Sequence, residues 1–180
     1  MQAQAQAKPS APGKVAILIG GIGCIILMVG AILTAFWIRD VRVGGVGVLL
    51  AGIGALFACF APIGMWQSEK VVAGMIDGIM GLVAGVIFLV GGILGAAQKS
   101  YAFEISEAGG VIFAVFLLFL GLILWKLQTK FNTESALKID LTIPAVITTL
   151  VGACTSINVL LLFTTIPAAL LCAILFFLKK

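Results

Sequence analysis

The sequence contains no histidine in 180 residues. Histidine is the commonest metal ligand and the commonest general base near neutral pH, so its absence removes the usual haem, zinc and copper sites and most acid–base catalysis. The four cysteines, Cys24, Cys59, Cys154 and Cys172, lie inside apolar runs without a C-x-x-C spacing, and we interpret them as buried thiols that act as small hydrophobes. We therefore expect no catalytic activity, no cofactor and no metal site.

Charged residues are also scarce. They make up 10% of the chain, against about 25% in soluble domains, and 62% of the residues are hydrophobic. Apolar runs as long as these are typical of an integral membrane protein, and the polar segments between them are too short for a soluble domain. The net charge of +4 is spread over the ends of the runs, which suits anchoring to lipid headgroups better than a nucleic-acid surface. The expected partner is the lipid bilayer, with no nucleic acid.

The apolar runs predict an all-α fold, a polytopic transmembrane helix bundle with short loops. Residues 1–14 are polar and contain two prolines, so they are expected to form a disordered cytoplasmic tail before a single transmembrane domain over residues 15–180. Pro62 falls near the end of the second helix, where we expect a kink. We predict six helices, over residues 15–38, 43–66, 69–97, 109–126, 143–163 and 166–179.

The last apolar run, residues 141–178, decides the number of spans. As one helix its 38 residues would be about 57 Å long, nearly twice a hydrocarbon core of about 30 Å. The tetrapeptide Thr-Ile-Pro-Ala occurs at 142–145 and again at 165–168, and Thr followed closely by Pro favours a helix start. We therefore expect a break at Thr164–Thr165 and six spans, or five spans if this segment does not cross twice.

Basic residues predict the orientation, because they concentrate on the cytoplasmic side of a membrane protein. With six alternating helices, Arg39, Arg42 and Lys99 fall on the side opposite the N-terminus, and a larger set falls on the side of the N-terminus. That larger set is Lys8, Lys14, Lys70, Lys126, Lys130, Lys138, Lys179 and Lys180. The prediction is a multi-pass protein of the cell membrane with both termini in the cytoplasm.

Glycine is abundant, with 22 residues, and on three predicted helices it recurs at steps of three and four. Residues with that spacing share one helix face, and small residues on one face let membrane helices approach closely. The candidate helix-packing residues are Gly20, Gly23, Gly30, Gly47, Gly54, Gly74, Gly78, Gly81 and Gly85. We expect the first three helices to pack through these faces, with the helix over 69–97 at the centre of the bundle.

Asp77 is the one ionisable residue inside a predicted span. Carboxylates within a membrane are costly, and they face a partner, a bundle interior or a wet cavity. One interpretation is a proton or cation site. The other is an interhelical hydrogen bond, or an ion pair with Lys14, Lys70 or Lys126. Asn158, in the helix predicted over 143–163, is a second polar candidate, either for solute coordination or for interhelical packing.

Two functional hypotheses follow. The first is a non-catalytic structural or accessory subunit of an oligomeric membrane complex. It is motivated by three small-residue faces, which offer more close-packing surface than three helices with one lipid face need. Other membrane subunits or self-association are then expected as partners. The alternative is a small ion- or proton-coupled transporter or channel that uses Asp77.

Overall fold

The computed structural model describes residues 11–70, 72–134, 143, 146–148, 150–151, 162 and 165–178. Asn158 and most of the helix predicted over 143–163 lie outside these residues, as does most of the predicted tail. Residues 11–14 of that tail belong instead to the first helix.

The described part of the chain is helical and contains no strand. Its helices are α1 (Ala11–Thr34), α2 (Val41–Ala58), α3 (Phe60–Glu69), α4 (Val72–Ala96), α5 (Ala102–Glu134) and α7 (Thr165–Leu178). Four stretches are long and apolar enough to cross a membrane: Val15–Thr34, Val41–Gln67, Val72–Ala96 and Ala102–Leu127. The chain is therefore an all-helical protein whose long apolar helices are compatible with a membrane bundle.

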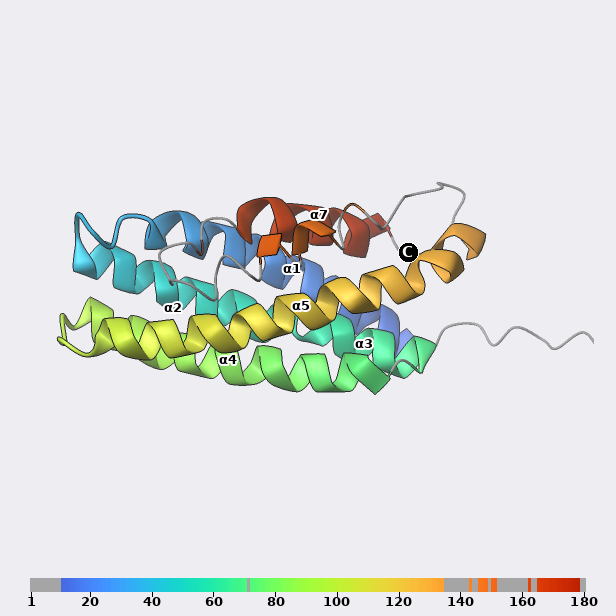
Figure 1. The fold of residues 1–180 in the computed structure, drawn as a ribbon, viewed down its shortest axis with the longest axis horizontal. Helices are drawn as coiled ribbons and strands as arrows, with labels where there is room; N and C mark the ends of the chain where they lie inside the picture. The colour runs from blue at the N-terminus through green and yellow to red at the C-terminus, as the bar shows by residue number, and fades with distance from the viewer. Residues whose placement is uncertain are drawn as a thin grey trace, which may run out of the picture.

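Helix α2 packs between α1 and α4, and α4 lies along the lower edge of the view in Figure 1. Helix α4 packs in turn against α5. Helix α7 lies on α1, and α3 contacts both α1 and α4. The turns from α1 to α2 and from α4 to α5 lie at the same end of the bundle (Figure 1). Because these turns are short, consecutive helices run in opposite directions.

The second predicted helix is divided at Cys59 into α2 and α3. Pro62 explains the division, because proline has no N–H to donate to the carbonyl of Ala58 four residues earlier. The next donor, the Ile63 N–H, reaches the Cys59 carbonyl only at 3.4 Å. The expected kink is thus a break in the helix, although the two pieces still form one span-length segment, Val41–Gln67.

Helix α5 begins at Ala102, seven residues before the predicted start at 109. The polar segment from 98 to 108 suggested a loop, yet most of it is helical. Ser106 shows why: its hydroxyl donates to the Ala102 carbonyl at 2.8 Å, so this polar side chain is satisfied within the helix and stays fully buried. Polar composition alone therefore gave the wrong boundary.

The glycines of the described helices face the interior of the bundle, together with bulky side chains such as Phe88, Phe113 and Phe116. Every glycine from Gly20 to Gly121 is buried. On α4, the side chains of Ile76, Ile79 and Val86 are exposed while the glycines between them are not. In a membrane this arrangement turns branched side chains toward lipid and leaves close helix contacts inside.

Candidate functional site

The glycine face of α4 lies against α2, α3 and α5. A Cβ atom placed on Gly74 would meet the carbonyl of Pro62, and one on Gly81 would lie 2.8 Å from Cβ of Cys59 and 2.9 Å from the ring of Phe116. A Cβ on Gly78 would meet the side chain of Ile63, and a Cβ on Gly85 would lie 2.7 Å from the side chain of Leu56. A real Cβ does not tolerate such distances, so these helices approach as closely as they do only because the side chains are absent.

The α1–α2 contact has the same character. A Cβ on Gly23 would meet the backbone nitrogen of Ala58, and one on Gly30 would meet that of Ala51. From the opposite side, Gly47 faces the backbone of Thr34 and Gly54 faces that of Leu27, while Gly20 faces Ala61. The candidate packing glycines therefore lie in two seams, one between α1 and α2–α3 and one between α4 and its neighbours.

Asp77 lies on the buried side of α4, about one turn from Gly74 and one turn from Gly81. Its side chain has no exposed surface. Neither carboxylate oxygen has a hydrogen-bond partner among the residues that the structure describes. Of the three lysines that the sequence offered as partners, the side chains of Lys70 and Lys126 are described. Both are exposed, and neither donates to the carboxylate of Asp77.

Two thiols lie within electrostatic range of Asp77. They belong to Cys59, at the break between α2 and α3, and to Cys172 on α7. The Cys59 thiol donates to the carbonyl of Leu56 at 2.9 Å, so its hydrogen is directed into its own helix and not toward the acid. Among the described residues, no donor therefore compensates a negative charge on Asp77 by a hydrogen bond, and a thiol is only a weak donor.

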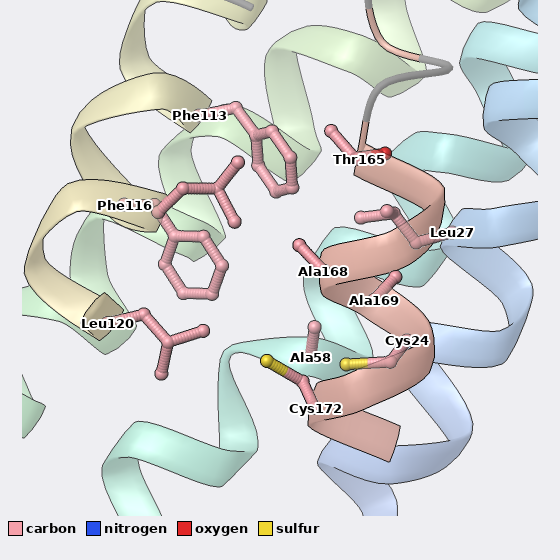
Figure 2. Close-up of a pocket in the computed structure, with 11 residues that line it drawn as sticks. Cys24, Leu27, Ala58, Phe113, Phe116, Leu120, Thr165, Ala168, Ala169 and Cys172 are labelled. Carbon is pink, nitrogen blue, oxygen red and sulfur yellow. The ribbon is translucent and has the colours of Figure 1, made fainter. Parts of the chain in front are cut away.

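Cys172 also lines a small cavity between α1, α2, α5 and α7 (Figure 2). Cys24 lies on its α1 side, Phe113 and Phe116 lie on its α5 side, and Thr165 closes it near the start of α7. The volume is about 20 Å³. A water needs roughly 10–15 Å³ and two to four polar partners, so the cavity has the size for one water but a mainly apolar lining. The Thr165 hydroxyl already donates to the carbonyl of Leu162 at 2.6 Å.

Sequence reasoning missed the placement of Cys59 and Cys172 near Asp77, and of Cys24 beside the same cavity as Cys172. These residues come from three separate helices and one helix break, so no spacing along the chain signals it. In the described segments, no three cysteine, aspartate or glutamate side chains are grouped so that they could hold a metal ion. Asn158, the other predicted polar site, lies outside the described residues.

Comparison with protein-family models, with curated proteins and with solved structures finds no match for this chain.

Proposed function

We propose that this chain is a non-catalytic, multi-pass membrane protein that moves protons, as a small transporter or channel in which Asp77 binds and releases the proton. One observation carries the proposal: both oxygens of a fully buried carboxylate lack a partner among the described residues. Buried polar groups in proteins are bonded in the great majority of cases, so an unbonded acid inside a membrane-length helix requires a reason.

The surroundings of Asp77 favour a proton over a metal cation. Binding a proton removes the charge of a carboxylate, and a neutral group costs far less to bury. A hard cation instead needs several oxygen ligands. The groups that the described residues place within electrostatic range of Asp77 are the thiols of Cys59 and Cys172, and thiols supply no such set of oxygens.

Two neighbouring features offer access to Asp77. The break at Cys59 interrupts a span-length helix beside the acid, and interrupted helices in membrane proteins occur where the backbone lines a cavity or a binding site. The second feature is the water-sized cavity, which Cys172 connects to the surroundings of Asp77. We infer that the proton reaches and leaves the carboxylate through these two features.

The orientation and the number of spans belong to the same proposal. Six crossings, with the helix predicted over 143–163 as the fifth, would place both termini in the cytoplasm of a cell-membrane protein and satisfy the lysine asymmetry. The start of α4 then lies on the cytoplasmic side, and Asp77, five residues into that helix, lies roughly 8 Å deeper.

The accessory-subunit hypothesis has less support than it had from the sequence. It needed small-residue faces left over for a partner, whereas every glycine from Gly20 to Gly121 is buried within this chain. The exposed faces of α1 and α4 carry bulky side chains, which suit lipid. A partner subunit remains the alternative proposal, and the mass of the detergent-solubilised particle tests it: a larger complex of fixed stoichiometry supports it.

The test of proton movement uses proteoliposomes that enclose a pH-sensitive dye. Under an imposed proton gradient we expect the native protein to change the internal pH faster than empty liposomes, and Asp77→Asn to abolish the difference. Glu104→Gln is the matched control, because it also neutralises an acid but at an exposed position in the first turn of α5. Native protein with no flux above empty liposomes, or equal flux from Asp77→Asn, would overturn the proposal.

A further inference from the structure

A second and larger cavity lies at the end of the bundle formed by the two short turns. Its volume is about 240 Å³, and it is lined by Trp37, Val41, Gln98, Lys99, Ser100 and Phe103. A water needs roughly 10–15 Å³, so this cavity accepts a much larger group. It lies about 30 Å along the axis of α4 from Asp77, and it plays no part in the function proposed above.

The apolar wall of this cavity is held in place by close packing. Trp37 is only 8% exposed. It fills the space above Gly44 and Gly95, where a Cβ would come within 2.6 Å and 2.8 Å of its side chain. Its ring meets that of Phe103 edge-on, with centroids 5.8 Å apart. The two aromatic residues therefore form a preformed surface.

The polar wall consists mainly of hydrogen-bond donors. The Gln98 side-chain oxygen accepts a long hydrogen bond of 3.5 Å from Arg42. The two amide N–H groups of Gln98 can therefore donate to a ligand. Lys99 supplies three donors and a positive charge, and Ser100 supplies a hydroxyl. None of the six lining residues is acidic. A cavity with this chemistry suits an anion that also carries an apolar part.

Nearby carboxylates do not compete for these donors within the cavity. Asp40 caps α2, where its side chain accepts from the backbone N–H groups of Arg42 at 2.8 Å and Val43 at 3.4 Å. Glu104 lies in the first turn of α5 with its side chain exposed, and it does not line the cavity.

The position of the cavity indicates the source of the anion. The apolar stretches stop at Thr34 and Ala96 and resume at Val41 and Ala102, so the cavity lies at the level of lipid headgroups. Trp37 and the half-exposed Tyr101 are the aromatic residues typical of that level. We propose that this cavity binds the phosphate of an anionic phospholipid headgroup, with Lys99 and Ser100 on the phosphate and Trp37 and Phe103 against its glycerol part.

The test uses Trp37 as its own reporter. Trp66 and Trp125 are more exposed, so we replace both with Phe in the full-length chain and follow the remaining tryptophan emission in neutral detergent. Phosphatidylglycerol is added as the probe, phosphatidylcholine as the zwitterionic comparison, and glycerol phosphate as the free anion. We expect a saturable shift with phosphatidylglycerol, and we expect Lys99→Gln to raise its midpoint about tenfold, as loss of a charged hydrogen bond does.

Two variants control for folding and for general charge. Lys126→Gln removes an exposed positive charge near the far end of α5, and it should leave the midpoint unchanged. Lys99→Arg should keep binding near the native level. A shift with glycerol phosphate alone that also depends on Lys99 supports the same site with a soluble phosphate as ligand. No saturable shift with either anion, or equal midpoints for Lys99→Gln and Lys126→Gln, would overturn the proposal.

Discussion

The indole of Trp37 lies edge-on against the ring of Phe103, with centroids 5.8 Å apart and planes inclined at 66°. This contact joins the turn after α1 to the first turn of α5, two segments that are far apart in the sequence. Gly44 on α2 and Gly95 on α4 leave the space that the indole occupies. Four helices are therefore tied together at this end of the bundle by one aromatic side chain.

Replacing Trp37 should destabilise the bundle more than replacing an exposed tryptophan. Trp37→Ala empties a packed site, and we expect a loss of about 3–5 kcal/mol in the free energy of unfolding. Trp125, which is 59% exposed, is the control, and Trp125→Ala should change stability by no more than about 0.5 kcal/mol. Denaturant unfolding in mixed micelles measures both. Equal losses of stability in the two variants would show that the packing of Trp37 does not contribute to stability.

One added carbon in the α1–α2 seam should cost more than one added carbon on the lipid face. Gly23→Ala places a methyl group against the backbone of Ala58, and overpacking of this kind costs about 1–3 kcal/mol. Val29→Ile adds one carbon on the same helix at a position that is 47% exposed, and it should be nearly neutral. Thermal unfolding of both variants checks this, and Gly23→Ala should have the lower midpoint temperature. A lower midpoint for Val29→Ile would contradict the close contact between α1 and α2.

Gly91 and Ser106 should be energetically coupled. A Cβ on Gly91 would meet the hydroxyl oxygen of Ser106, so Gly91→Ala should be strongly destabilising in the native background and less so with Ser106→Ala. The expected coupling in a double-mutant cycle is about 0.5–3 kcal/mol, as for residues in contact. Strict additivity would mean that α4 and α5 do not meet at this pair.

If Asp77 is retained for function, its buried carboxyl group should lower the free energy of unfolding of the native protein. Leucine has the shape of aspartate with methyl groups in place of the oxygens. Asp77→Leu therefore removes a buried carboxyl group that has no hydrogen-bond partner among the described residues, and it should stabilise the bundle by about 1–3 kcal/mol. Thr34→Val is the contrasting control, because the Thr34 hydroxyl is buried but bonded to the Gly30 carbonyl at 2.9 Å. This variant should not gain stability. A clear loss with Asp77→Leu would favour a structural role for the acid.

The boundaries of the helices were only partly accessible from the sequence. The helix predicted over 69–97 is Val72–Ala96 in the structure, so both ends were predicted to within three residues. An apolar run with charged residues on either side shows where a helix of this kind begins and ends. The start of α5 was misplaced, since Ser106 and Glu104 have the composition of a loop while the helix bond of Ser106 and its packing on Gly91 keep the segment helical. Tertiary contacts override composition where a polar side chain can be satisfied inside the bundle.

The sequence by itself determined the long apolar helices that are compatible with a membrane, the faces on which glycine recurs and the presence of one acid within such a helix, because each of these is a property of a single helix. Only the tertiary structure decided which backbones fill the glycine faces, that Asp77 has no hydrogen-bond partner among the described residues, and that Cys59 and Cys172 lie near it. The physical reason is that periodicity fixes which side of a helix is small or polar, whereas the packing of helices from distant parts of the chain fixes what that side meets.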